Sequence, residues 1–300
     1  MIEVQPVPKF DIPDAYLTEI VRTALIEDAP WGDLTTNAVV PESVLARGVI
    51  ESAACGILAG MPVVIEVFRQ IDQSVTVKPL VAEGSAILPE EPLGIVEGPA
   101  RAVLTGERVA LNFLQRLSGI ATLTGRFVEA VAGTGVAIAD TRKTTPGLRQ
   151  LQRYAVRAGG GANHRMCLSD AVMIKDNHIV AAGGIVAAVE RARRCVPHTC
   201  TVTVECETLA HVSEALEAKA DILLLDNMDP HTLRQAVGLV AGKAVTEASG
   251  GVNVNNVADI AATGVDIISV GALTHSAAAL DMRIELSLVG SEAASPLKAG

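Results

Sequence analysis

The chain has 300 residues, of which 49% are hydrophobic and 19% charged, so it is too apolar to be disordered and long enough to bury a sizeable core. Its net charge of −10 argues against a nucleic-acid or anionic-membrane surface, and neither is an expected partner. Aromatic residues make up only 2%, so Val, Ile, Leu and Ala must build the core, as in strands covered by helices on both faces.

The first 115 residues are expected to form a separate α+β module. A helix is predicted over 15–27, and the turn-rich segment 27–36 follows it. Short stretches of alternating apolar residues, separated by Gly and Pro, then indicate a small antiparallel sheet with one or two helices. Apolar residues at helical spacing over 105–131 predict one or two long helices that join this module to the rest.

Strand and helix signals alternate from Val136 onward. Six apolar runs are predicted as strands: 136–139, 171–174, 201–204, 222–225, 244–247 and 266–270. Helices are predicted between and after them, at 148–158, 184–194, 208–218, 230–240, 253–262 and from Thr274. Such strand–helix repeats indicate a parallel sheet closed, or nearly closed, into an α/β barrel. We therefore place a barrel domain at 116–277, after a first domain at 1–115, and expect 278–300 to pack on that first domain.

Cysteine usage and the N-terminal sequence indicate where the protein works. The five cysteines are odd in number, and no pair has the two-residue spacing of common zinc or redox sites, which favours a reducing compartment. The sequence shows no signal-peptide pattern and no apolar run of membrane-spanning length. A cytoplasmic location is therefore expected.

Basic residues gather where the first two barrel strands end. The segment 142–194 holds ten Lys or Arg against three acids, although the whole chain is acidic. Since residues at the carboxyl ends of barrel strands form the active face, these groups are expected to neutralise two or three carboxylates of a small anion. The alternative is a set of solvated surface cations. The candidates at or after these strand ends are Arg142, Lys143, His164, Arg165 and Lys175.

Two acids end the next two predicted strands. Glu205 and Asp226 lie on neighbouring strands, which are roughly 5 Å apart in a sheet. They can share a Mg²⁺ ion or the hydroxyls of a sugar, and they can stabilise a cationic transition state. Alternatively, each caps the helix that follows it.

Glycines lie in the last two strand–helix loops. Ser249, Gly250 and Gly251 precede a helix expected near Asn253, and Gly271 precedes the helix expected near Thr274. Glycines before a helix let bare backbone amides approach a phosphate, and the last two loops of a barrel commonly hold one. His275 is placed to assist. With the cations and the acid pair, these loops indicate a phosphorylated sugar that meets a small carboxylic acid.

A series of strings in one order extends along nearly the whole chain. They are EDAPWGDLTT (27–36), GERVALNFLQRLSGIAT (106–122), DTRKTTPGLR (140–149), GGGANHR (159–165), IKDNHI (174–179), VECETL (204–209), LLLDNM (223–228), EASGGV (247–252) and ISVGALTHS (268–276). Through these strings the chain resembles the quinolinate phosphoribosyltransferase family. The resemblance implies an N-terminal α/β sandwich followed by an open six-stranded α/β barrel. It also implies a homodimer in which the N-terminal domain of one subunit covers the barrel mouth of the other.

The resemblance also implies which residues form the site. The dicarboxylate would be bound by Arg142, Lys143, His164, Arg165 and Lys175, with Arg108 reaching in from the partner subunit. The phosphoribosyl group would be bound by Glu205, Asp226, Ser249, Gly250, Gly251 and Gly271, with Mg²⁺ on the pyrophosphate near the two acids. Thr141, Val270, Ala272 and His275 are placed with them as substrate contacts, and the catalytic residues would be Glu205, Asp226, Lys143 and Lys175. Cys167 and Cys206 depart from the family pattern, where Gly and an aliphatic residue are expected.

The implied reaction joins quinolinate to 5-phosphoribosyl 1-pyrophosphate and gives nicotinate mononucleotide, pyrophosphate and CO₂ for NAD biosynthesis. Three alternatives stay open at this point. A Lys at the end of a barrel strand, such as Lys175, also suits a Schiff-base aldolase acting on a sugar phosphate. The others are a non-catalytic protein that binds a phosphorylated ligand, and an enzyme of the same fold with another ring acid, such as nicotinate.

Overall fold

The structure is a computed structural model that describes residues 9–289, and these residues form two compact units. The barrel unit consists of residues 123–277, and the N-terminal unit consists of residues 9–122 together with 278–289. The division falls inside the long helix α4 (Ala100–Ala130), which contributes turns to both units. The predicted boundary after residue 115 lies in the same helix, and α4 is one continuous helix where one or two were expected.

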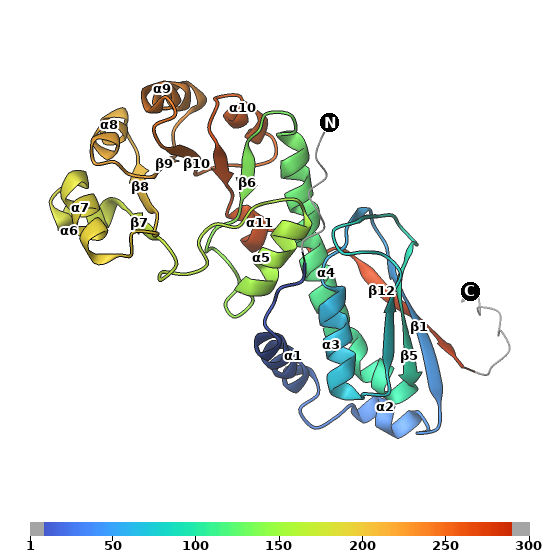
Figure 1. Ribbon diagram of the computed structural model, residues 1–300. Helices are drawn as coiled ribbons and strands as arrows, with labels where there is room; N and C mark the ends of the chain where they lie inside the picture. Colours follow the sequence, from blue (N-terminus) through green and yellow to red (C-terminus); the bar gives the residue numbers. More distant parts are fainter. Residues whose placement is uncertain (1–8, 290–300) are drawn as a thin grey trace. The chain divides into compact units, whose positions relative to one another are not determined.

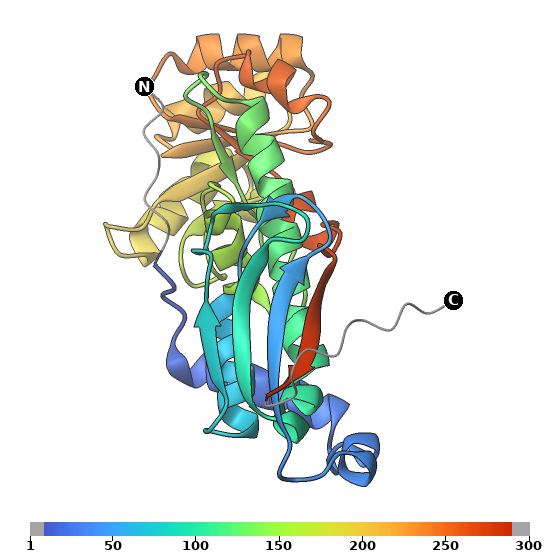
Figure 2. The same ribbon diagram turned by 90° about the vertical axis from the view of Figure 1, so that its right-hand side faces the viewer.

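An antiparallel sheet forms one layer of the N-terminal unit. Its strands follow the order β12-β1-β5-β3, with bounds Met282–Leu288, Leu45–Ser52, Pro92–Pro99 and Thr76–Pro79 (Figure 2). β12 pairs with β1 from Ala46↔Leu288 to Ser52↔Met282, so a segment near the C-terminus belongs to this sheet. Residues 290–300 of the segment that was expected to pack here lie outside the described residues. A second sheet pairs β2 (Gly56–Ile57) with β4 (Ala86–Ile87).

Helices form the other layer of the N-terminal unit. α3 (Met61–Ile71) has Gly60 as its N-cap residue. It buries one apolar face, formed by Val63, Val64, Val67 and Phe68. α1 (Asp14–Asp28), the predicted first helix, packs on α3 and buries Leu17 and Val21. The segment predicted as turns also contains α2 (Leu34–Val39), because the Asp33 side chain accepts a hydrogen bond from the backbone N–H of Thr36 and caps it.

The barrel unit contains a parallel six-stranded sheet. The strands are β6 (Ala137–Ala139), β7 (Val172–Ile174), β8 (Val202–Cys206), β9 (Ile222–Asp226), β10 (Val245–Ser249) and β11 (Ile267–Ser269). They follow the order β6-β11-β10-β9-β8-β7, so β6 and β7 are the two ends and do not pair with each other. The predicted α/β fold with an open parallel sheet and a separate antiparallel sheet is therefore confirmed.

Helices follow these strands, and the helices between β7 and β11 lie on the outer side of the sheet (Figure 1). The helices that follow the strands are α5 (Arg149–Ala158), α6 (Asp176–Ala182), α7 (Ile185–Cys195), α8 (Leu209–Glu217), α9 (Pro230–Val240), α10 (Val257–Ala261) and α11 (Ala272–His275). Two differ from the prediction: α6 was not expected, and α10 begins at Val257 instead of near Asn253. The side chain of Asn253 accepts from the backbone N–H of Asn255, and this local bond holds the preceding turn out of the helix. Within residues 9–289, no helix combines the length and the apolarity needed to cross a bilayer.

Alternation along the strands separates the helix-covered face from the inner face of the barrel sheet. Val204, Leu223, Leu225 and Ile268 are fully buried and form part of the core beneath the helices. Since successive side chains of a strand point to opposite faces, Glu205, Leu224 and Asp226 turn to the inner face. In each strand, one set of alternate side chains therefore packs in the core, and the other set faces the inner side, where a site can form.

Candidate active site

A cavity of about 370 Å³ lies at the carboxyl ends of the barrel strands. Thirteen residues line it: Thr141, Arg142, Lys143, His164, Arg165, Met173, Lys175, Glu205, Leu224, Asp226, Glu247, Ser249 and Ser269. The structure therefore brings together predicted site residues that lie more than 100 residues apart in the sequence. Its volume falls in the usual range for small-molecule sites.

The pairing of the strands explains which residues face this cavity. Glu205 on β8 and Glu247 on β10 are both in register with Leu224 on β9. Ser249, at the end of β10, is in register with Asp226. Because paired residues of parallel strands point to the same face, these side chains form two rows on the inner face.

Three cations of the cavity are available to an anion. Arg142, Lys143 and Arg165 form no ion pair with a carboxylate in the part of the chain that the structure describes. Arg165 donates one guanidinium N–H to the backbone oxygen of Ala171 at 2.9 Å, which fixes its position. Burial lowers the pKa of Arg165, and the neighbouring charge of Arg142 lowers it further. Two cations that repel each other in a partly buried site are suited to bind a dianion.

A buried carboxylate holds the loop that carries His164 and Arg165. Asp140 is fully buried directly after β6, and it accepts from the backbone N–H of His164 at 2.8 Å and from the side-chain amide of Asn163 at 2.7 Å. Arg153 of α5 lies 3.5 Å from the same carboxylate and also donates to the backbone oxygen of His164. Burial raises the pKa of Asp140, while Arg153 and these hydrogen bonds act in the opposite direction. This network fixes the backbone from which the side chains of His164 and Arg165 enter the cavity.

The acid pair is not used for helix capping. Thr208 caps α8 and Asp229 caps α9, so neither Glu205 nor Asp226 serves the helix that follows it. Glu205 is buried and forms an ion pair with Lys175. Burial raises the pKa of Asp226, and the charge of Glu205 raises it further. The carboxylates are therefore close enough to repel each other at the cavity wall.

The glycine loops lie next to these acids and to Lys143. Gly250 has φ +92°, and a Cβ there would fall 2.1 Å from the side-chain oxygen of Asn227, the residue after Asp226. A Cβ at Gly271 would lie 2.9 Å from Cδ of Lys143 and 3.3 Å from Nε2 of His275. The first loop therefore needs glycine at position 250, whereas a side chain at position 271 would require the flexible Lys143 side chain to move.

Several predicted site residues lie outside the cavity wall. Val270 is buried, and its backbone N–H donates to the backbone oxygen of Ala139. The others outside the wall are Gly250, Gly251, Gly271, Ala272 and His275, which belong to the loops just described. Arg108 belongs to the other unit, where it is exposed on α4 and forms no ion pair within residues 9–289.

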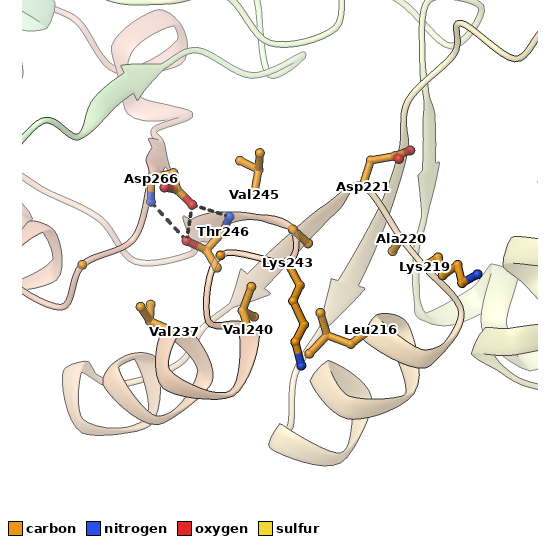
Figure 3. A pocket seen from close by; sticks show the side chains of 13 residues that line it. Leu216, Lys219, Ala220, Asp221, Val237, Val240, Lys243, Val245, Thr246 and Asp266 are labelled. Atoms are coloured by element: carbon orange, nitrogen blue, oxygen red, sulfur yellow. Dashed lines mark hydrogen bonds between the residues drawn. The ribbon is translucent and has the colours of Figure 1, made fainter.

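A second cavity, of about 840 Å³, lies at the amino ends of β9, β10 and β11 (Figure 3). Its carboxylates are already in use. Asp266 accepts from both the backbone N–H and the hydroxyl of Thr246, and Asp221 accepts from the backbone N–H of Val202 and pairs with Arg193. These bonds hold strand beginnings in place, so the smaller cavity is the better candidate active site.

Two family models together match most of the chain. The model for the N-terminal domain of quinolinate phosphoribosyl transferase matches residues 33–118, and the model for its C-terminal domain matches residues 120–285. The chain belongs to the quinolinate phosphoribosyltransferase family. The resemblance drawn from the sequence strings is thus confirmed.

Relatives of this family match over nearly their full length. The chain is 41% identical to a probable nicotinate-nucleotide pyrophosphorylase [carboxylating] of Bacillus subtilis, over 91% of this chain and 94% of that protein. It is 40% identical to the nicotinate-nucleotide pyrophosphorylase [carboxylating] of Rattus norvegicus, over 94% of this chain and 95% of that protein. The crystal structure of NadC from Streptococcus pyogenes has a TM-score of 0.90 at 40% identity and covers 93% of this chain and 99% of that one.

Sequence reasoning missed four residues of the cavity in this quinolinate phosphoribosyltransferase family member. Met173, Leu224, Glu247 and Ser269 all belong to strands β7 to β11 or their immediate ends. Each lies two residues before a predicted site residue and therefore points to the same face of its strand. Applying the period of two to each strand, instead of reading only its last residue, would have identified them.

The two departures from the family pattern lie apart from the cavity wall. Cys206 follows Glu205 on β8 and therefore points to the opposite face, where it is fully buried. Burial, with the charges of Glu205 and Glu214, raises the pKa of its thiol to about 12, so the thiol stays protonated. Cys167 is exposed in the loop that follows Arg165.

Proposed function

We propose that this protein transfers a phosphoribosyl group from 5-phosphoribosyl 1-pyrophosphate to quinolinate, with loss of CO₂, and so forms nicotinate mononucleotide for NAD biosynthesis. One observation carries the proposal. Three cations that form no ion pair within residues 9–289, Arg142, Lys143 and Arg165, line the same cavity as the carboxylates of Glu205 and Asp226. This combination suits an aromatic diacid next to an activated sugar.

The cations bind and orient the diacid. Arg142 and Arg165 can each take a carboxylate of quinolinate in a bidentate pair, and Lys143 adds a point charge. With the diacid held, its ring nitrogen faces the anomeric carbon of the sugar, and the reaction becomes effectively unimolecular. Lys175 contributes through its ion pair with Glu205, which keeps both groups in the wall of the site.

The acids stabilise the positive charge that develops on the sugar. As the ring nitrogen attacks the anomeric carbon, the bond to pyrophosphate breaks and the ribose becomes oxocarbenium-like. The carboxylates of Glu205 and Asp226 stabilise this charge. The nitrogen becomes quaternary. The bond between the neighbouring ring carbon and its carboxylate then breaks, and CO₂ leaves. The electron pair stays on the ring carbon beside the positive nitrogen and takes a proton from solvent, so no dedicated general acid is needed.

The acid pair fits Mg²⁺ only together with a substrate. Within residues 9–289, no group of three His, Cys, Asp or Glu side chains could hold a metal ion. Mg²⁺ is commonly bound by one or two carboxylates plus substrate phosphates, and Glu205 with Asp226 can supply the protein's share. When bound, the ion would neutralise charge on the leaving pyrophosphate.

The glycine loops are proposed to bind the 5-phosphate and the pyrophosphate. Ser249 supplies a hydroxyl at the cavity wall, and Gly250 and Gly251 leave backbone amides uncovered beside it. Gly271 allows its loop to come close to Lys143, which can reach the same phosphate. Thr141, Val270, Ala272 and His275 border these loops as further contacts.

A homodimer would complete the site. Arg108 is exposed on α4 and forms no ion pair within residues 9–289, which fits a role at the site of a partner subunit. Large apolar side chains are exposed on both units: Trp31 (93%) and Leu34 (83%) on the N-terminal unit, Val180 (82%) and Leu168 (70%) on the barrel unit. The interface of the proposed dimer would cover such side chains. All five cysteines are free thiols, which supports the proposed cytoplasmic location.

The Schiff-base alternative is weaker in this geometry. An imine-forming lysine must lose its proton, and aldolase sites achieve this by removing the lysine from counter-charges. Lys175 instead lies against the carboxylate of Glu205, and this ion pair occupies its amine.

The direct test incubates the protein with quinolinate, phosphoribosyl pyrophosphate and Mg²⁺. We expect CO₂ and nicotinate mononucleotide in equal amounts, and neither when phosphoribosyl pyrophosphate is left out. Nicotinate in place of quinolinate is the matched control, because it lacks the second carboxylate and can release no CO₂. Turnover of nicotinate at the rate of quinolinate, or an imine trapped by borohydride, would refute the proposal.

A further inference from the structure

Glu247 faces the cavity from β10, and the proposed function gives it no task. Its side chain is only 3% exposed. It shares a register row with Glu205, but Leu224 on β9 lies between them, so the two acids are roughly 10 Å apart at the backbone. Glu247 is therefore separate from the ion pair of Lys175 with Glu205.

One oxygen of Glu247 lacks a hydrogen bond. Oε1 is buried and has no hydrogen-bond partner in the described chain. The imidazole Nε2 of His164 is 3.4 Å away from it, within ion-pair distance but long for a hydrogen bond. Buried carboxylate oxygens are normally satisfied, because leaving one without a donor costs stability. A residue that serves only packing would not need this charge.

The other edge of the His164 ring is already occupied. Its Nδ1 accepts the backbone N–H of Arg165 at 2.6 Å. A ring nitrogen that accepts from an amide N–H carries no proton, so the proton of the neutral ring is on Nε2. Nε2 is the nitrogen that lies toward Glu247.

We propose that Glu247 is a positioning residue that orients the His164 ring, in the tautomer whose proton lies on Nε2, the nitrogen nearest to Glu247. His164 then serves as a hydrogen-bond donor to a carboxylate oxygen of the substrate, and the positive charge of the subsite comes from Arg142, Lys143 and Arg165. Because the contact to Glu247 is long, the Nε2 proton remains available to the substrate. The inference rests on the proposed function for the identity of that substrate, but the state of the ring does not.

The state of the ring is tested on the free protein. In ¹⁵N-histidine NMR spectra, the signals missing from a His164→Ala variant assign the His164 ring. We expect an unprotonated Nδ1 and a protonated Nε2 at neutral pH. Glu247→Gln removes the charge and places an amide that can donate next to Nε2, so the other tautomer should become populated. A doubly protonated ring in the wild type, a proton on Nδ1, or a ring unchanged by Glu247→Gln would overturn the proposal.

A double-mutant cycle tests whether Glu247 acts through His164. We expect Glu247→Gln to raise KM for quinolinate about tenfold, with kcat and KM for phosphoribosyl pyrophosphate changed less than about twofold. In the His164→Ala background, Glu247→Gln should add nothing. Losses that multiply in the double variant would contradict the proposal.

Thr246→Val is the matched control for the strand. Thr246 is the buried neighbour of Glu247, and its hydroxyl donates to Asp266 (Figure 3). Both residues line the cavity at the amino ends of the strands and not the candidate active site. The Thr246→Val variant should be less stable than the wild type and have the same KM for quinolinate. If its KM rises as much as that of the Glu247→Gln variant, the effect of Glu247→Gln is only a loosening of β10. If the wild type does not turn over quinolinate at all, the proposed function fails, and the NMR spectra alone decide the role of Glu247.

Discussion

Asp226 works against the stability of the fold. Burial and the charge of Glu205 raise its pKa, so the ionised carboxylate opposes folding at neutral pH. A carboxyl group with a raised pKa in the folded state contributes its stability below the unfolded-state pKa and loses it as the pH rises through the folded-state value. A residue kept under these conditions is more consistent with function than with structure.

Asp226→Asn should therefore stabilise the protein while it abolishes turnover. We expect a higher Tm than that of the wild type at pH 7.5, and equal values below about pH 4, where both states of the wild type are protonated. Thermal unfolding monitored across this pH range makes the comparison. A lower Tm at neutral pH would mean that Asp226 holds the fold together.

Asp140 is also buried with a raised pKa, but its carboxylate holds structure that Asp226 does not: it accepts from the backbone N–H of His164 and lies against the charge of Arg153. Asp140→Ala leaves Arg153 without its counter-charge, and we expect a loss of about 3 kcal/mol in the free energy of unfolding. Asp229→Ala, which removes only the exposed cap of α9, should cost clearly less than Asp140→Ala and spare activity. Urea titration of both variants gives the comparison, and equal losses would argue against the buried network.

At the scale of elements, the loop after β10 should tolerate a methyl group at one glycine and not at its neighbour. Gly250→Ala would push the new Cβ against Asn227, beside Asp226, whereas a Cβ at Gly251 meets no atom within 4 Å. Both positions have positive φ, so backbone strain is common to the two variants. We expect Gly250→Ala to raise KM for phosphoribosyl pyrophosphate about tenfold more than Gly251→Ala does. Equal effects would mean that strain alone matters.

The sequence was sufficient for the elements whose periodicity is long and regular. The strand that ends at Asp226 and the helix after it were predicted within a residue or two, because a buried apolar run is followed by a helix with the cap Asp229 and Pro230. α6 was missed because its seven residues carry no apolar stripe, and none of them is buried. α10 begins late because Asn side chains compete with the helix for backbone N–H groups.

For the site, strand ends were predictable and strand interiors were not. Arg142, Lys175 and Glu205 were identified because a polar residue after an apolar run is conspicuous. Glu247 was missed because only the residue at the end of its strand was considered, although Glu247 lies two residues before Ser249 and therefore on the same face of β10. Its alignment with Leu224 across the sheet was not predictable. Register between strands is a property of the folded sheet and cannot be read from one segment.

At the scale of the whole molecule, the proposed dimer predicts complementation between two inactive variants. Arg108→Ala and Lys175→Ala should each abolish turnover. In a mixed dimer, one of the two sites would combine an intact barrel with Arg108 of the partner subunit, so random exchange should restore about a quarter of wild-type activity. Activity is measured after the two proteins are unfolded together and refolded. No recovery, with mixed dimers present by mass spectrometry, would exclude the shared site.

The central claim is that one cavity holds both substrates. The most direct measurement is a crystal structure with quinolinate and a non-reactive analogue of phosphoribosyl pyrophosphate. The account predicts the diacid on Arg142 and Arg165 and the ribose on Glu205 and Asp226, in one cavity at the carboxyl ends of the strands. Either ligand bound instead among Lys219, Lys243 and Asp266, at the amino ends of the strands, would contradict it.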